Sequence, residues 1–417
     1  MSSDGIKPFQ IAIPETQLSD LRDRLSKTRF PDELADSEWQ SGAPLADVQR
    51  LANYWAENFD WRQAEAQLNR YPQFTTDLQA EGFETMSVHF IHQRSSAKDA
   101  IPLLFIHGWP GSFYEGIKLI EPLTQGGGAG GANGEGGPKF HIVVPSIPNF
   151  GFSQGTRNRG FSIEHHAEIL NKLMLRLGYD RYATQGGDWG WFISRALSLR
   201  YPAHARAQHL NLDHAAKPTW TKHPLLALQH ALTPYTAREK QGLARMAWFA
   251  NEGSGYTNLQ ATRPQTLGYL LADSPTGLLA WIYEKLHDWT DGYPWTDDEI
   301  CTWISVYWFS TAGPAASTRL YHEYNRANTG KRPGAVTADM LKEWNPHVKV
   351  GLAHFPMDVI TTPRIWSHTQ GKVVFERTHE KGGHFPAWER PDAIVDDLRQ
   401  MFAKGAEART AVESEKV

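Results

Sequence analysis

The spacing of apolar residues changes near Phe83 and divides the chain into two kinds of segment. Before that point, apolar residues recur at helical intervals in residues 18–25 and again in residues 48–54, and Pro31 ends the first pattern. We interpret residues 1–90 as a helical and irregular region that wraps the rest of the protein and carries no site of its own.

Beyond Phe83, short apolar segments alternate with helical patterns. Residues 86–94, 101–108, 140–148 and 181–187 read as strands, and residues 162–178 and 191–202 read as helices. This alternation predicts an α/β fold with a mostly parallel sheet and helices on both of its faces. The glycine-rich stretch at residues 124–139 cannot hold a regular element and is expected to form a surface loop.

The second half of the chain is predicted to contain a helical cap. Residues 214–345 are rich in Trp, Tyr and Pro and show helical patterns without a convincing strand. We therefore expect a core in two parts, residues 91–213 and 346–405, with the helical insertion covering the edge of the sheet that bears the site. The polar residues 406–417 are expected to fray.

The charge and the cysteine content argue against a nucleic-acid-binding, membrane-spanning or disulfide-bonded protein. The chain has 417 residues, with 42 Lys and Arg against 46 Asp and Glu, which argues against nucleic acid or an anionic membrane as the main partner. The single cysteine, Cys301, rules out an internal disulfide, and no segment approaches the ~18 consecutive apolar residues of a membrane span. We expect a soluble, cytoplasmic protein that acts on a small molecule, and a homodimer is a possible assembly.

No motif predicts a metal or a cofactor. The sequence has neither an H-E-x-x-H pattern nor a Cys/His cluster. The neighbours His165 and His166 lie on a helical pattern without a companion carboxylate at ligand spacing.

The strongest local motif is Gly-Gly-Asp-Trp-Gly at residues 186–190, between a predicted strand and a predicted helix. A strand that turns sharply into a helix needs small residues around the turn, because the two backbones approach closely there. The central side chain then projects from the top of the sheet beside a helix N-terminus. The pattern predicts a nucleophile elbow with Asp188 in the place where serine is usual.

A competing motif, Gly-Phe-Ser-Gln-Gly at residues 151–155, matches the G-x-S-x-G pattern of serine hydrolases. The preceding strand pattern ends earlier, at Pro145, and no helical run begins before Ser162. Because the motif lacks the strand–turn–helix context, Ser153 is a weaker candidate nucleophile than Asp188.

The turn His-Gly-Trp-Pro-Gly-Ser at residues 107–112 follows the predicted strand at 101–106. A glycine-rich turn at the carboxyl end of a strand can present backbone N–H groups to the site. We expect the N–H groups of Trp109 and Trp189 to form an oxyanion hole, and Pro110 is a candidate for a cis peptide bond.

A histidine and an acid complete the predicted set. His384 lies in a glycine-flanked loop after a late strand pattern, and Asp358 follows the strand pattern before that. The chain order Asp188, Asp358, His384 is nucleophile, acid and base. Asp392, Asp396 and Asp397 come later, on a helix face that we expect to be solvated, and are weaker candidates.

Taken together, these motifs resemble those of the α/β-hydrolase epoxide hydrolases of the microsomal type. The resemblance also includes residues 9–33, 145–153, 255–289 and 382–391, so it extends over nearly the whole chain. It implies an α/β-hydrolase fold with a mostly parallel central sheet, a helical cap and an N-terminal meander. The mammalian microsomal enzymes begin with a membrane anchor, which we do not expect in this chain.

The resemblance also implies two tyrosines of the cap as the acids that open the ring. Tyr256 stands in the first matching segment and Tyr321 in the second. Tyr324 is close enough to Tyr321 to leave the second assignment open. Trp109 and Trp189 are expected to contact the substrate.

An aspartate in the nucleophile position predicts a particular chemistry. A carboxylate is ionised at neutral pH without help from a base, so Asp188 can attack a saturated carbon directly and form an ester. We expect an epoxide hydrolase that converts an apolar or aromatic epoxide to a vicinal diol. The alternatives are a haloalkane dehalogenase with the same nucleophile, a serine esterase that uses Ser153, and a non-catalytic binding protein on the same fold.

Overall fold

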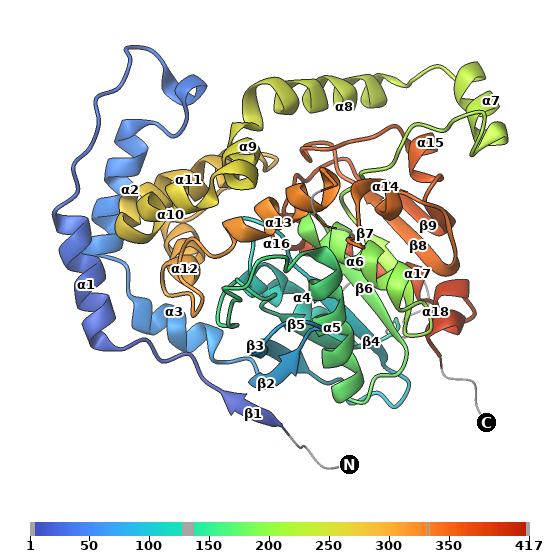
Figure 1. Cartoon of the computed structure of the whole chain (residues 1–417), viewed down its shortest axis with the longest axis horizontal. Helices are drawn as coiled ribbons and strands as arrows, with labels where there is room; N and C mark the ends of the chain where they lie inside the picture. Colours follow the sequence, from blue (N-terminus) through green and yellow to red (C-terminus); the bar gives the residue numbers. More distant parts are fainter. Residues whose placement is uncertain (1–4, 127–136, 331, 333, 414–417) are drawn as a thin grey trace.

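The computed structural model describes residues 5–126, 137–330, 332 and 334–413, and the predicted glycine-rich loop falls largely outside these ranges. The described residues form one sheet of nine strands (Figure 1). The strands are β1 (Ile6–Phe9), β2 (Gln73–Gln79), β3 (Thr85–Gln93), β4 (Ile101–Ile106), β5 (Phe140–Pro145), β6 (Tyr182–Gly186), β7 (Ala205–Leu210), β8 (Asn345–His354) and β9 (Gly371–Thr378).

The sheet is parallel from β5 to β9 and antiparallel at its other end. Its strand order is β1-β2-β3-β5-β4-β6-β7-β8-β9, and the five pairings from β5–β4 to β8–β9 are parallel. Leu103, Leu104 and Ile106 of β4 have no exposed surface, as expected for a strand covered on both faces. The predicted α/β class and mostly parallel sheet are therefore confirmed.

The first 90 residues contribute strands as well as helices, which differs from the helical and irregular region that we expected. β1 pairs with β2, and β2 pairs with β3, both in antiparallel fashion, so the two strands extend the sheet. β2 has the sequence Gln-Phe-Thr-Thr-Asp-Leu-Gln, in which few apolar residues mark the alternation of a strand. Pairing with β3 gives this polar segment its conformation.

Helices cover both faces of the parallel part of the sheet (Figure 1). The helices and helical turns of the core are η2 (Phe113–Gly116), α4 (Ile117–Glu121), η3 (Pro122–Gly126), α5 (Ile163–Arg176), α6 (Trp189–Arg200), α14 (Ala338–Leu341), α15 (Arg364–Ser367), α16 (Pro386–Glu389), α17 (Pro391–Met401) and α18 (Glu407–Val412). The His165 ring accepts the backbone N–H of the N-cap residue Ser162 at 3.1 Å where α5 begins, so His165 has a local structural role.

The cap is helical, as predicted, and lies over one edge of the sheet (Figure 1). It comprises α7 (Pro224–Leu232), α8 (Ala237–Trp248), η4 (Phe249–Gly253), α9 (Gly255–Thr262), α10 (Pro264–Asp273), α11 (Pro275–Asp288), α12 (Asp297–Trp308) and α13 (Thr318–Asn328). Capping boxes at Thr236 and Thr296 begin α8 and α12, and Pro264 and Pro275 begin α10 and α11.

The N-terminal helices pack against the cap. They are α1 (Glu15–Ser26), η1 (Glu38–Ser41), α2 (Leu45–Glu57) and α3 (Trp61–Leu68). Arg50 of α2 pairs with Asp297 of α12 at 2.5 Å, and the ring of Trp39 stacks on His287 of α11 with centroids 3.5 Å apart. The N-terminal region therefore supports the cap helices that carry part of the site.

The chain beyond residue 405 contains a packed helix, α18, which corrects the expectation of fraying for residues 407–412; residues 414–417 lie outside the described residues. Ala408 and Val412 lie one turn apart and are buried, and Arg409 pairs with Asp99 at 2.6 Å. Two apolar residues in a polar segment are too few to predict a helix from the sequence. The helix α18 is stabilised by its packing against the sheet.

Candidate active site

The turn between β6 and α6 has the geometry of a nucleophile elbow. Asp188 occupies it with φ 47° and ψ −128°, in the left-handed region that is strained for a residue with a side chain. A Cβ at Gly190 would clash with the carbonyl oxygen of Ile106 in β4, and a Cβ at Gly186 would lie 2.8 Å from the carbonyl carbon of Gly190. The glycines are therefore required by close backbone approach, as the motif predicted.

The carboxylate of Asp188 faces the turn after β4. The backbone N–H of Trp109 donates a hydrogen bond of 2.8 Å to Asp188 Oδ1. The turn brings the Asp188 carboxyl so close that a Cβ at Gly108 would overlap it. Trp109 thus lies beside the candidate nucleophile, and the Trp109–Pro110 peptide bond is cis, as expected.

His384 and Asp358 lie next to each other, at the ends of β9 and β8. His384 Nδ1 donates to Asp358 Oδ1 at 2.7 Å, and His384 Nε2 lies 3.5 Å from Asp188 Oδ2. The side chains of His384 and Asp358 are 1% exposed, whereas 20% of the Asp188 side chain remains exposed. The structure therefore brings Asp188, His384 and Asp358 together, with His384 between the two carboxyl groups. The candidate nucleophile, Asp188, is the exposed one of the three.

Two carboxylates control the protonation of His384. Burial lowers the pKa of His384, but Asp358 and Asp188 outweigh burial and raise it to about 10. Burial raises the pKa of Asp358, and its partner His384 opposes that shift. The two neighbouring carboxyl groups therefore favour the protonated form of the His384 imidazole.

The later acids do not join this group. Asp397, which we expected on a solvated helix face, has no exposed surface and lies 2.6 Å from His379 Nε2 and 3.2 Å from Arg377. The helix α17 turns this residue towards the sheet, where it pairs with β9 and the residue after it. The local pattern predicted the helix but did not reveal which face is buried.

Both predicted cap tyrosines lie over the core part of the site. Tyr256 of α9 stacks on Trp109 with ring centroids 4.9 Å apart, and Tyr321 of α13 makes an edge contact with Trp189 at 4.7 Å. The two tyrosine rings are 5.9 Å apart. Burial is the main cause that raises the pKa of both phenols above the usual range, with Asp188 adding to it, so both stay protonated at neutral pH.

Tyr324 occupies a different position from Tyr321. Its ring contacts Trp189 at 5.3 Å and Phe192 at 5.1 Å, on α6. Tyr321 instead contacts Trp109 and Tyr256, the residues next to the Asp188 carboxylate. The geometry favours Tyr321 as the partner of Tyr256.

Two further residues at the site gave no local signal in the sequence. Trp289, at the end of α11, lies 4.9 Å from His384 and 5.2 Å from Tyr256, ring to ring, and its carbonyl accepts the N–H of His384. Glu115 of η2 is 9% exposed, and burial raises its pKa to about 8, while His384 opposes that shift. A single tryptophan or glutamate in a helical segment does not show from the sequence that it lies beside the candidate site.

Ser153 is not placed to act as a nucleophile. It has no exposed surface, its hydroxyl donates to the carbonyl of Ser146 at 2.6 Å, and it accepts the N–H of His89 at 2.8 Å. These bonds join the loop after β5 to β3. The structure therefore gives Ser153 a structural role.

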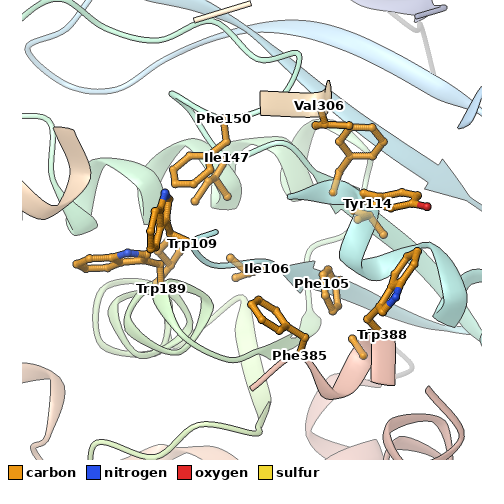
Figure 2. Packing of buried hydrophobic residues seen from close by; sticks show 14 of the residues in the cluster. Phe105, Ile106, Trp109, Tyr114, Ile147, Phe150, Trp189, Val306, Phe385 and Trp388 are labelled. Atoms are coloured by element: carbon orange, nitrogen blue, oxygen red, sulfur yellow. The ribbon is translucent and has the colours of Figure 1, made fainter. Parts of the chain in front are cut away.

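Aromatic and aliphatic side chains form the floor of the site. Figure 2 shows Ile106, Trp109 and Trp189 among the buried residues at this end of the sheet, with Phe385 from the loop that carries His384. A separate cavity of about 760 Å³ lies behind Asp358, between the α7–α8 region and the loops after β8 and β9. Its lining includes neither Asp188 nor the two tyrosines, so it is distinct from the space in front of the nucleophile.

Within residues 5–126, 137–330, 332 and 334–413, no group of three or more His, Cys, Asp or Glu side chains is arranged to hold a metal ion. In the same part of the chain, no helix has the length and apolar character needed to cross a bilayer.

Comparisons with known proteins agree with the architecture. Residues 6–116 match the family model described as epoxide hydrolase N terminus, and residues 101–240 match the alpha/beta hydrolase fold. The chain is 34% identical to epoxide hydrolase 1 of Sus scrofa over 419 residues, covering 96% of this chain and 89% of that protein.

Two solved structures are similar over almost their full length. The epoxide hydrolase of Aspergillus niger has a TM-score of 0.80 and 32% identity, covering 96% of both chains. The juvenile hormone epoxide hydrolase of Bombyx mori has a TM-score of 0.81 and 29% identity, covering 95% of this chain and 94% of that one. The α/β-hydrolase fold is thereby confirmed, and this chain belongs to the epoxide hydrolase family with the N-terminal segment of the microsomal type.

Proposed function

We propose that this enzyme converts an apolar or aromatic epoxide and water to a vicinal diol through a covalent ester on Asp188. The observation that carries the proposal is an accessible carboxylate at a strained elbow, with a His–Asp pair beside it and two protonated phenols above it. Displacement at a saturated carbon requires an ionised nucleophile and a proton donor for the departing oxygen. The site contains both.

In the first step, a carboxylate oxygen of Asp188 attacks a ring carbon and the C–O bond of the epoxide breaks. The leaving oxygen takes a proton from Tyr256 or Tyr321, so that a neutral hydroxyl forms in place of an alkoxide. Because burial keeps the pKa of both phenols high, each remains a proton donor throughout the neutral range. Two phenols that share one oxygen also orient the ring for attack.

Ester formation changes the state of His384. Asp188 loses its negative charge when it is alkylated, so one of the two carboxylates that raise the pKa of His384 is removed. The imidazolium can then release its proton, which restores the tyrosine through solvent. The base therefore becomes available after the ester has formed.

In the second step, neutral His384 takes a proton from water, and the resulting hydroxide attacks the ester carbonyl of Asp188. Asp358 holds the ring through Nδ1 and stabilises the imidazolium. The N–H groups of Trp109 and Trp189 stabilise the oxyanion, in the place where Trp109 now binds Asp188 Oδ1. Collapse of the tetrahedral intermediate breaks the bond to the alkyl oxygen, which takes the proton of the His384 imidazolium and leaves as the diol. The new carboxyl group of Asp188 gives its proton back to His384, which regenerates the carboxylate.

The surroundings of Asp188 support an apolar or aromatic substrate. The rings of Trp109 and Trp289 pack against Tyr256, and the indole of Trp189 packs against Tyr321, so aromatic surface lies on both sides of the tyrosine pair. Such walls favour binding by apolar contact and stacking.

The origin of the oxygen in the product tests the ester. In a single turnover of styrene oxide in heavy-oxygen water, with enzyme in excess, the label should appear in Asp188 and not in the diol. In the variant His384→Ala, the ester should accumulate as a mass increase on the peptide that contains Asp188. Label in the first diol, or diol production by Asp188→Asn without reversion to Asp, would overturn the proposal. Ser153→Ala serves as a control that should label in the same way as the wild type.

A further inference from the structure

A lysine is buried in the cap beside the first tyrosine. Lys285 of α11 is 2% exposed, and its Nζ donates to Glu284 Oε1 at 2.6 Å. The same Nζ lies 5.2 Å from the centroid of the Tyr256 ring and 4.8 Å from that of Trp281. The ammonium is thus surrounded by two aromatic rings and one carboxylate.

The burial of this ammonium has a cost that packing alone does not explain. Removing a cation from water disfavours its charged form, and burial lowers the pKa of Lys285 accordingly, while Glu284 opposes the shift. A methionine or leucine would fill the same space without that cost. Contact of a cation with an aromatic ring recovers part of it, because the face of the ring carries negative charge.

The ring that Lys285 contacts is the one that also stacks on Trp109. The planes of Tyr256 and Trp109 are 15° from parallel, and the N–H of Trp109 binds the Asp188 carboxylate. Lys285 therefore contacts Tyr256, and the ring of Tyr256 stacks on Trp109, the residue that binds Asp188. Any change in the position or charge at Nζ acts on the site through Tyr256.

We propose that Lys285 is a positioning residue for ring opening: its buried ammonium holds the ring of Tyr256 and stabilises the negative charge that grows on the phenol oxygen as the proton moves to the epoxide. This inference rests on the proposed function and adds a residue to it. Lys285 itself need not touch the substrate, because a cation against the ring favours the phenolate more than the neutral phenol.

Two uncharged neighbours, Thr257 and Tyr321, lower the pKa of Tyr256 through side-chain hydrogen bonds. The charged groups other than Lys285 act in the opposite direction or through an intermediate residue. After burial, the negative charges of Asp188 and Glu284 raise the pKa of Tyr256. Tyr321 faces it from α13, with ring centroids 5.9 Å apart, and remains protonated. His384 reaches it through Trp289. Lys285 supplies positive charge in direct contact with the ring.

The test measures the rate of ester formation as a function of pH. The alkaline limb is the fall of this rate at high pH. Stopped-flow tryptophan fluorescence should follow this step, since Trp109, Trp189 and Trp289 line the site. Lys285→Met keeps the volume and removes the charge; we expect alkylation about 3- to 10-fold slower at neutral pH and an alkaline limb shifted upwards by up to about one unit. Lys285→Arg should retain most of the rate and the wild-type limb.

Lys118 provides a matched control. Its ammonium also lies against aromatic rings, 3.7 Å from the centroid of Trp388 and 5.1 Å from that of Tyr293, on the core side of the cap. Lys118→Met removes a lysine of the same kind without contact with Tyr256. We expect its alkaline limb to remain that of the wild type.

Two further variants separate an effect on Tyr256 from a general loss of structure. In a Tyr256→Phe background the ring remains but the phenol is absent, so adding Lys285→Met should change alkylation by less than about twofold. Glu284→Gln, at a partly exposed position, removes an anion and should shift the alkaline limb downwards. This variant provides a test if Lys285→Met does not fold.

The results distinguish this inference from the proposed function. If the wild type forms no ester, the proposed function itself fails. If the wild type forms the ester but Lys285→Met alkylates at the wild-type rate with an unshifted limb, the role of Lys285 is wrong. The inference would also be overturned if Lys285→Met slowed alkylation equally in the wild-type and Tyr256→Phe backgrounds. That result would indicate that Lys285 acts only through packing in the cap.

Discussion

The indole of Trp109 and the phenol ring of Tyr256 stack with centroids 4.9 Å apart and planes 15° from parallel. Trp109 belongs to the turn after β4, whereas Tyr256 belongs to α9 of the cap. The same tryptophan donates its backbone N–H to Asp188 at 2.8 Å. One residue therefore links the proposed nucleophile in the core to a proposed proton donor in the cap.

Removing the indole should impair ring opening more than ester hydrolysis. In Trp109→Leu the backbone N–H remains, but Tyr256 loses the surface on which it stacks. Because a small displacement of a proton donor is costly, we expect alkylation to slow about 10- to 100-fold, with a smaller effect on the second step. Rapid-quench measurement of ester and diol separates the two rates. A larger loss in hydrolysis would assign Trp109 mainly to the oxyanion.

The two steps should depend differently on pH. In the free enzyme, Asp358 and Asp188 raise the pKa of His384 to about 10 against the effect of burial. Esterification removes the charge of Asp188, so the pKa of His384 falls, and hydrolysis should be fast above this lower value and slow below it. The ester should therefore accumulate in single turnovers as the pH is lowered. An ester level that is independent of pH would contradict this account.

The choice between the two neighbouring tyrosines on α13 is directly testable. Tyr321 faces Tyr256 at 5.9 Å, whereas Tyr324 packs on Phe192. Tyr321→Phe should slow alkylation about 10²-fold, since it removes a proton donor, and Tyr324→Phe should stay within a few-fold of the wild type. Stopped-flow fluorescence gives both rates. The reverse order would assign the second acid to Tyr324.

A cluster away from the site should control stability in acid. Glu376 of β9 lies 3.0 Å from His354, 3.3 Å from His368 and 2.5 Å from Arg364. Burial raises the pKa of its carboxyl, but hydrogen bonds from His354, His368 and Arg364 outweigh burial and hold it well below the usual range.

A depressed pKa in the folded state gives stability that is present above the unfolded value of about 4.3 and is lost as the pH falls towards the folded value. Glu376→Gln should therefore lower the free energy of unfolding by about 1–3 kcal/mol at pH 7, with a difference from the wild type that shrinks below about pH 4. Urea unfolding at several pH values measures this. A constant difference across that range would contradict the linkage.

Several features of this protein follow from the sequence because they depend on local requirements. Gly186 and Gly190 are needed wherever a strand bends into a helix at close range, so the motif located the elbow and its central residue. The buried strands β4 and β5 are short, mostly apolar runs, and the cap segments keep helical spacing over long windows. Their places after the late strand patterns, and the chain order, made Asp358 and His384 the candidate acid and base. The resemblance of whole segments added the cap tyrosines as candidate proton donors.

The tertiary structure decided what local pattern does not contain. The polar strand β2 exists through its pairing with β3, and α18 exists through docking on the sheet. The burial of Asp397 depends on which face of α17 meets the sheet. The contact of Lys285 with Tyr256, and that of Tyr256 with Trp109, join a helix, a second helix and a turn that lie far apart in the chain. Such contacts arise from packing between helices and strands, which depends on the whole fold. The spacing of apolar residues along the chain shows only whether a segment has the repeat of a helix or of a strand.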